Sequence, residues 1–184
     1  MKELSLNILD VAKNSVKEGA TLIRIVLETD ERGMLTLSII DNGCGMSEEV
    51  LRGVTDPFYT TRTTRKVGMG LPLLKMAAEQ TGGSLSITSS VKEGESGTAL
   101  VATFDTKSID CMPLGDIAST VCVLIAGSPD IDFEFLDKRP NGAVELNTAE
   151  LREVLGSDIS LAEPEIQEWI EGNITEQYQV LNSI

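Results

Sequence analysis

Asp41-Asn42-Gly43-Cys44-Gly45-Met46 decides the predicted fold of this chain, and it directly follows residues 34–40, whose apolar pattern predicts a β-strand. An aspartate at a strand end can accept a hydrogen bond from an exocyclic amine, and two glycines let a flat ring approach the backbone. The spacing Asp-x-Gly-x-Gly also occurs in many ordinary turns. The stretch therefore needs support from the rest of the chain.

A second glycine pair lies in Gly68-Met69-Gly70-Leu71, after a loop at 55–67 that carries Arg62, Arg65 and Lys66 among threonines. The pair precedes a helix predicted over 70–80, where free backbone N–H groups at the helix start bind phosphate well. No Gly-Lys-Ser/Thr follows, and the order of elements excludes a dinucleotide-binding fingerprint. Two interpretations stay open here, an anion-binding loop and a solvated loop that ends in a helix-capping turn.

A third polar feature lies on the helix predicted from Leu4 to about Val16, whose apolar residues follow one face. Asp10 and Asn14 are four residues apart and so lie one above the other on this helix. One of them can hold a metal ion while the other orients or deprotonates a water. An ordinary exposed polar face is the alternative for this pair taken alone.

These features occur in a fixed order, together with Phe58-Tyr59-Thr60-Thr61-Arg62 and Gly97-Thr98. In this order they closely resemble the GHKL superfamily of ATP-binding domains, which gyrase B subunits, MutL, the heat-shock chaperone and histidine kinases share. The resemblance covers about residues 1–106 and is nearest to the catalytic domain of sensor histidine kinases. It implies an α+β fold, a two-layer sandwich of a mixed sheet with helices on one face, and it implies ATP and Mg²⁺ as ligands.

The resemblance assigns the adenine end of the site to the turn and to a neighbouring strand. Asp41 matches the residue that reads the adenine amino group, and Gly43, Gly45 and Met46 form the turn that the ring approaches. Thr98 matches the hydroxyl that helps to fix adenine, often through water.

The phosphate end follows from the same resemblance. Asn14 matches the asparagine that holds Mg²⁺ between the phosphates, and Lys17 matches a lysine that reaches a phosphate. Gly68, Gly70 and Leu71 match the phosphate-side turn. Phe58 matches the aromatic that anchors the nucleotide lid, and the lid cations are Arg62, Arg65 and Lys66.

Three positions depart from the histidine-kinase pattern or add to it. Pro72 replaces the third glycine of the phosphate-side motif, and proline is tolerated in the first turn of a helix. Asp10 stands where many histidine kinases have asparagine and where ATP-hydrolysing relatives and anti-sigma-factor serine kinases have glutamate. It is therefore the candidate catalytic base, with a supporting role at Mg²⁺ as the alternative. Cys44 is interpreted as a small filler of the turn or as a redox-sensitive thiol.

The chain contains no histidine among its 184 residues, and this excludes serine–histidine catalysis and histidine-ligated zinc. It also excludes phosphate transfer to a histidine of this sequence. Three cysteines without a Cys-x-x-Cys pair, the lack of a long apolar run and the charged N-terminus predict a reduced, cytoplasmic protein that does not enter a membrane.

Acidic charge is concentrated in the C-terminal part. Residues 1–106 carry 11 basic and 14 acidic side chains, a net charge of −3, while residues 107–184 carry 4 and 15, a net charge of −11. Such a segment repels nucleic acid. We predict a nucleotide-binding domain over 1–106 and a small α+β appendage over 107–184, which aids solubility, extends the sheet, packs on it, or forms a dimer or partner surface.

The appendage is predicted in some detail. A helix near 114–126 precedes two strands joined by an Asn-Gly turn at Asn141-Gly142. Thr148 is the expected cap of the next helix, and two short helices over 163–171 and 175–181 are expected to close the chain.

Three functions remain open at the level of sequence. The first is a histidine-kinase-like protein, either a protein kinase or an ATPase, that acts in trans on an unidentified partner. The second is an anti-sigma-type serine kinase and binding module, and the third is a nucleotide sensor without catalysis. The whole chain also resembles short ATPase-like proteins encoded beside iron-only hydrogenase subunits in anaerobic bacteria.

Overall fold

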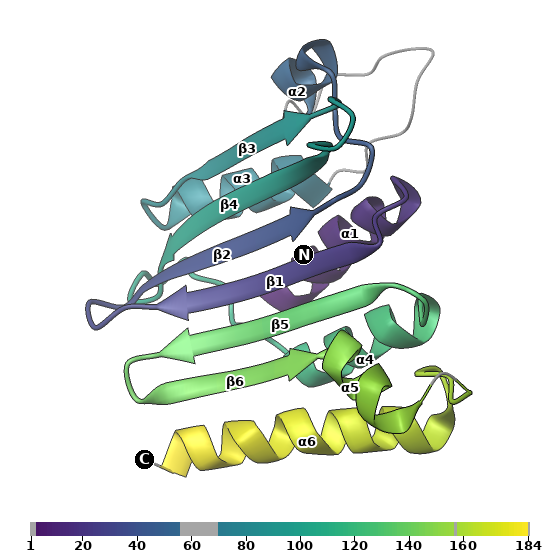
Figure 1. Ribbon diagram of the computed structural model, residues 1–184. Helices are drawn as coiled ribbons and strands as arrows, with labels where there is room; N and C mark the ends of the chain where they lie inside the picture. Colours follow the sequence, from purple (N-terminus) through teal and green to yellow (C-terminus); the bar gives the residue numbers. More distant parts are fainter. Residues whose placement is uncertain (1–2, 56–69, 157, 184) are drawn as a thin grey trace.

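The computed structural model describes residues 3–55, 70–156 and 158–183, which form one six-stranded sheet with helices packed against it (Figure 1). The strands are β1 (Leu22–Thr29), β2 (Met34–Asp41), β3 (Leu85–Ser90), β4 (Gly97–Asp105), β5 (Asp132–Arg139) and β6 (Gly142–Asn147). The helices of the described residues are α1 (Leu4–Lys17), α2 (Glu48–Gly53), α3 (Gly70–Gln80), α4 (Ile117–Gly127), α5 (Thr148–Leu155) and α6 (Pro164–Ser183).

The sheet is mixed, as predicted, and its strand order is β3-β4-β2-β1-β5-β6. Four neighbouring pairs are antiparallel, while β5 runs parallel to β1. The strands of the predicted appendage thus extend the sheet of the N-terminal part, which was one of the alternatives. The predicted hairpin is confirmed, but its turn is shifted by one residue: Arg139 pairs with Gly142, so the two turn residues are Pro140 and Asn141 rather than Asn141 and Gly142.

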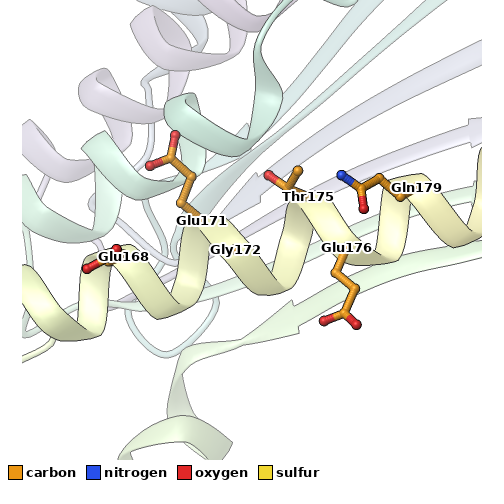
Figure 2. A pocket seen from close by; sticks show the side chains of 6 residues that line it. All are labelled: Glu168, Glu171, Gly172, Thr175, Glu176 and Gln179. Carbon is orange, nitrogen blue, oxygen red and sulfur yellow. The ribbon is translucent and has the colours of Figure 1, made fainter.

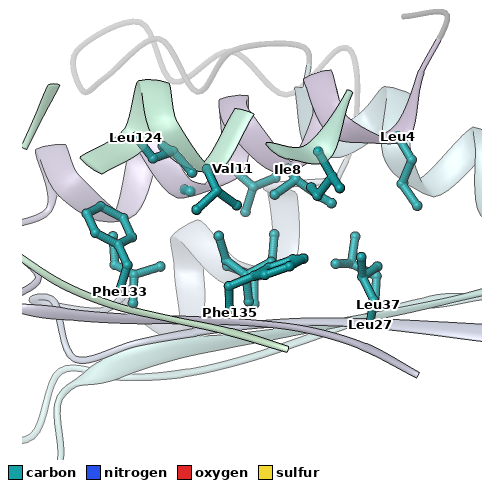
Figure 3. Packing of buried hydrophobic residues seen from close by; sticks show 14 of the residues in the cluster. Leu4, Ile8, Val11, Leu27, Leu37, Leu124, Phe133 and Phe135 are labelled. Atoms are coloured by element: carbon teal, nitrogen blue, oxygen red, sulfur yellow. The ribbon is translucent and has the colours of Figure 1, made fainter. Parts of the chain in front are cut away.

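The core lies between the sheet and the helix layer (Figure 3). Alternate residues of the strands point to the helices, and in β1 these are Ile23, Ile25 and Leu27, all at most 1% exposed. Figure 3 shows Ile8 and Val11 of α1 above Phe133 and Phe135 of β5. Side chains of this size each contribute about 1.5–3 kcal/mol on full burial. The apolar face of α1 is therefore held against the middle of the sheet.

The N-terminus of α1 is capped by a distant part of the chain. No side chain caps this helix, but the N–H groups of Leu4 and Ser5 donate to the carbonyls of Pro113 and Leu114 at 2.9 and 2.8 Å. Two of the free donors at the helix start are satisfied in this way. The segment before α4 therefore fixes the helix that carries Asp10 and Asn14.

The outer edge of β6 is covered by α6. The side-chain amide of Gln177 donates to the Glu145 carbonyl at 3.0 Å and accepts from the Glu145 N–H at 2.9 Å, as a neighbouring strand would. Tyr178 also donates to the buried Asp137 at 2.7 Å, and Asp137 accepts from Arg139 at 2.9 Å. The two hydrogen bonds of Gln177 satisfy backbone groups of Glu145 at an edge that would otherwise be open to pairing with another chain.

Two predictions for the C-terminal part are wrong. The cap of α5 is Asn147, whose side chain accepts from two backbone N–H groups, while Thr148 turns inward and accepts from the Phe133 N–H at 2.8 Å. The two short closing helices are one helix, α6. Burial of Ile170 and Ile174 on one face holds the helix together and offsets the roughly 1 kcal/mol cost of its internal glycine.

Among the described residues, no helix is both long enough and apolar enough to cross a bilayer. The longest of them, α6, carries four glutamates along its 20 residues.

Candidate nucleotide site

Three polar residues form a row across the sheet at the end where β2 stops. Thr98 of β4 is the register partner of Asp41 of β2 on one side and of Ser89 of β3 on the other. Partners in adjacent strands point to the same face, which here is the helix face that also holds Ile39 and Leu100. The sheet therefore ends in a polar row directly beyond its apolar core.

Asp41 is held by two donors. The Ser15 hydroxyl of α1 donates to its Oδ2 at 2.6 Å, and the Gly43 N–H donates to its Oδ1 at 2.9 Å. Ser15 is 5% exposed, so the contact is shielded from solvent. The carboxylate thus has a set orientation and keeps free lone pairs that can accept from a ligand.

Ser89 joins the turn after β2 to the neighbouring strands. Its hydroxyl oxygen accepts from the Met46 N–H at 2.7 Å, donates to the Gly97 carbonyl at 2.9 Å and lies 2.9 Å from the Thr98 hydroxyl. Ser89 thus links the Met46 backbone to Thr98, while the Met46 side chain is partly buried against the core.

Two glycines, one in the turn and one at the start of β4, are required by close backbone contacts. Gly45 has φ +72°, and a Cβ at this position would lie 1.9 Å from the carbonyl oxygen of Ser90. Gly97 has φ +145°, and its Cβ would lie 2.1 Å from the Asp41 carbonyl oxygen. Side chains are excluded from both positions, which lets the turn pack against the ends of β3 and β4.

The turn is also tied to the chain around β1. The side-chain oxygen of Asn42 accepts from the N–H groups of Thr21 and Leu22 at 2.8 and 2.9 Å. The Cys44 N–H donates to the Glu18 carbonyl at 3.0 Å, and the Cys44 thiol donates to the Glu18 carboxylate at 2.9 Å. These contacts tie both the backbone and the exposed thiol of Cys44 to Glu18.

The other predicted residues of α1 lie along the same helix. Asp10 is exposed and faces the start of α3, where a Cβ on Gly70 would lie 3.5 Å from the Asp10 Cβ and 3.7 Å from its Oδ2. Asn14 is partly buried and Lys17 is exposed in the last turn. Because Ser15 contacts Asp41, α1 borders the polar row near its C-terminal end and the start of α3 near its middle.

The start of α3 follows the predicted pattern. The helix begins at Gly70, and Pro72 lies in its first turn, where a missing N–H costs nothing. Leu71 is 7% exposed and packs in the core. The remaining predicted residues, Phe58, Arg62, Arg65, Lys66 and Gly68, lie outside the described residues.

A magnesium ion fits the oxygen donors of α1. Mg²⁺ keeps several waters and takes one or two protein oxygens together with substrate phosphates, so it does not need a cage of protein ligands. Within the described residues no group of three or more acidic, cysteine or histidine side chains is placed to hold a metal. The partly buried amide of Asn14 with Asp10 one turn away matches the sparse donor set of a nucleotide-bound ion.

Sequence reasoning did not identify Ser15 and Ser89. Ser15 follows directly on the predicted Asn14, and helical spacing shows that it faces away from Asp10, but nothing local shows that it reaches Asp41. Ser89 is one of four serines between positions 84 and 90, and only the register of β3 against β4 distinguishes it from the others.

A hollow on α6 is the alternative place for a ligand (Figure 2). It is lined by one helix alone, by Glu168, Glu171, Gly172, Thr175, Glu176 and Gln179. Three glutamates and no cation repel a triphosphate. The polar row and α1 therefore remain the candidate nucleotide site.

Comparison with known proteins identifies the family of the N-terminal part of the chain. The family model described as "Histidine kinase-, DNA gyrase B-, and HSP90-like ATPase" matches residues 2–108. The C4-dicarboxylate transport sensor protein DctB of Pseudomonas aeruginosa is 31% identical over 96 residues, 51% of this chain and 16% of that protein. Sporulation kinase D of Bacillus subtilis is 36% identical over 90 residues, 47% of this chain and 17% of that protein. The match thus spans only about a sixth of each relative.

Solved structures show the same fold over a longer part of the chain. The ATPase domain of Aquifex aeolicus MutL, complexed with ADP, aligns with a TM-score of 0.53 and 12% identity over 84% of this chain and 69% of that one. The N-terminal domain of a DNA repair protein aligns with a TM-score of 0.54 and 14% identity over 80% of this chain and 52% of that one. The likeness in fold therefore extends beyond residue 108.

Proposed function

Because the chain belongs to the family of histidine kinase-, DNA gyrase B- and HSP90-like ATPases, we propose that it binds Mg·ATP and acts with it on a separate protein. The observation that carries the proposal is the row of Asp41, Thr98 and Ser89, with Ser15 holding the aspartate in place. A partly buried carboxylate with free lone pairs is suited to an exocyclic amine such as that of adenine.

The phosphate end supports the same proposal. Asn14 would hold Mg²⁺, and the ion would supply charge neutralisation at the phosphates when it is bound. The start of α3 offers free N–H groups at the positive end of the helix. Lys17 is exposed nearby on α1 and is free to turn toward an anion.

Asp10 is the proposed catalytic base. Its carboxylate is exposed and faces the glycine that begins α3, which is where the terminal phosphates would lie. From there it can take a proton from a water or from a hydroxyl of a protein substrate. Asp10 can therefore serve as the base both in hydrolysis of ATP and in phosphate transfer to serine or threonine. No histidine of this sequence can be the phosphate acceptor.

Residues 107–184 are the proposed partner surface. They carry most of the negative charge of the chain, and α6, which belongs to them, contains no lysine or arginine. They also contact α1, since Pro113 and Leu114 cap it. A partner bound to this part would thus be close to the helix that carries Asn14.

The test separates binding from turnover. Titration calorimetry measures ATP affinity with and without Mg²⁺, and a phosphate-release assay measures hydrolysis. We expect Asn14→Ala to abolish Mg²⁺-dependent binding, and we expect Asp10→Asn to bind ATP normally without turnover. Lys13→Ala, an exposed change on the same helix, is the matched control. Equal loss of binding and turnover in Asp10→Asn would contradict its role as the base.

A sensor without catalysis is distinguished by the same measurements. Tight ATP binding without phosphate release, and without label on any co-purified protein from γ-labelled ATP, would remove both the ATPase and the kinase. Affinity capture of partners by the full chain with and without ATP then shows whether the nucleotide changes the partner's affinity.

A further inference from the structure

The hydrogen-bond network around Ser89 fixes the direction of the neighbouring hydroxyl. A serine hydroxyl has one hydrogen and two acceptor lone pairs. The Met46 N–H can only donate to it, and the Gly97 carbonyl can only accept from it, at 2.7 and 2.9 Å. For the third contact, at 2.9 Å, to be a hydrogen bond, Thr98 must then be the donor. Ser89 thus takes up the only hydrogen of the Thr98 hydroxyl.

The Asp41 carboxylate, the second polar group of the row, likewise offers a ligand only lone pairs. Asp41 is an acceptor, and the hydrogen of the Ser15 hydroxyl is spent on its Oδ2 at 2.6 Å. Thr98 lies directly opposite Asp41 in the register of β2 and β4. The side chains of the row therefore offer lone pairs to a ligand and no hydrogen.

We propose that Ser89 is a specificity-determining residue of this site. It holds the Thr98 hydroxyl as an acceptor, so that the site binds a 6-amino purine nucleotide in preference to a 6-oxo purine nucleotide. The proposal rests on the proposed ATP binding and adds the residue that sets the choice of base. An amine donates to these lone pairs, whereas a carbonyl at the same place meets acceptors only, and such a mismatch leaves buried polar groups without partners. Ser89 acts through Thr98 and is a positioning residue.

The test compares ATP with ITP, which carries a carbonyl in place of the amine. Titration calorimetry gives both dissociation constants for the full chain and for Ser89→Ala. We expect the wild type to prefer ATP by at least about 100-fold. In Ser89→Ala the Thr98 hydroxyl is free to rotate and donate. The preference for ATP over ITP is therefore expected to fall about tenfold, which corresponds to one hydrogen bond. Ser86→Ala, an exposed change on the same strand, is expected to keep the wild-type ratio.

A double variant shows whether Ser89 acts through Thr98. Thr98→Val removes the hydroxyl at nearly constant volume, and we expect it to lower the ATP preference by itself. Ser89→Ala added to Thr98→Val is then expected to change the ratio no further, because the hydroxyl that it would release is absent. A general loosening of the fold would instead weaken ATP and ITP equally and leave the ratio unchanged.

The outcomes separate this inference from the function on which it rests. A wild-type chain that binds neither nucleotide overturns the proposed function. A wild-type chain that binds ATP, with an unchanged ATP-to-ITP ratio in folded Ser89→Ala, overturns the inference alone. If circular dichroism shows that Ser89→Ala is unfolded, Thr98→Val takes its place in the test. An unchanged ATP-to-ITP ratio in Thr98→Val then overturns the inference alone.

Discussion

Replacement of Gly45 by alanine isolates the close approach of the Asp41–Met46 turn to the end of β3. The backbone of Gly45 has φ +72°, and its Cβ would lie 1.9 Å from the Ser90 carbonyl oxygen and 2.7 Å from the carbonyl carbon, where ordinary contact begins at 3.4 Å. Gly82, after α3, is the matched control. It has φ +81° with nothing within 4 Å of its Cβ.

The two variants share one cost and differ in the other. Alanine in the left-handed region costs about 1–2 kcal/mol at either position. Only Gly45→Ala must also move backbone, because no flexible side chain can yield, and overpacking of this kind adds about 1–3 kcal/mol. We therefore expect Gly45→Ala to lower the free energy of unfolding by about 1–3 kcal/mol more than Gly82→Ala does.

Urea denaturation followed by circular dichroism measures both free energies. ATP titration of the same samples adds a second comparison, in which Gly45→Ala loses affinity and Gly82→Ala does not. Equal destabilisation of the two variants would refute the reasoning, since it would show that the turn yields to a side chain without cost.

Three further predictions concern other parts of the molecule. Ser15→Ala should weaken ATP binding about three- to tenfold, because Asp41 loses a shielded donor; calorimetry checks this, and an unchanged affinity would show that Gly43 alone orients the carboxylate. Burial and the nearby carboxylates raise the pKa of the Cys122 thiol from 9.0 to about 11. The thiol of the unfolded chain therefore loses its proton at a lower pH than the thiol of the folded chain, and the free energy of unfolding should fall as pH rises from 9 to 11. In urea titrations across that range, Cys122→Ala should show a shallower fall. Gln177→Ala should destabilise the fold by about 1–2 kcal/mol and leave the Glu145 edge open to pairing; sedimentation velocity measures the self-association, and a monomer of wild-type stability would contradict the role of this amide.

Local signals were sufficient for the elements that carry the site. The apolar period of 3.6 predicted α1, and the strand pattern over 34–40 predicted β2. The helix predicted over 70–80 is α3 as the structure has it.

Errors arose where a distant contact outweighed a local preference. Thr148 has the chemistry of a helix cap, but the Phe133 N–H on β5 needs an acceptor, and Asn147 takes the cap instead. Gly172-Asn173 suggests a break in a helix, but packing of the flanking isoleucines on the core carries α6 through it. In both cases the deciding partner lies on another element, which no local window contains.

The sequence by itself determined the glycine turn, the polar positions of α1 and the absence of an acceptor histidine, because spacing and residue type are properties of the chain alone. The tertiary structure alone decided that β5 lies parallel to β1, that Pro113 and Leu114 cap α1, and that Ser89 lies opposite Thr98. Register and helix docking depend on side chains that meet only after the sheet has formed. The polarity of the proposed nucleotide site therefore follows from the packing of β3, β4 and α1 against one another.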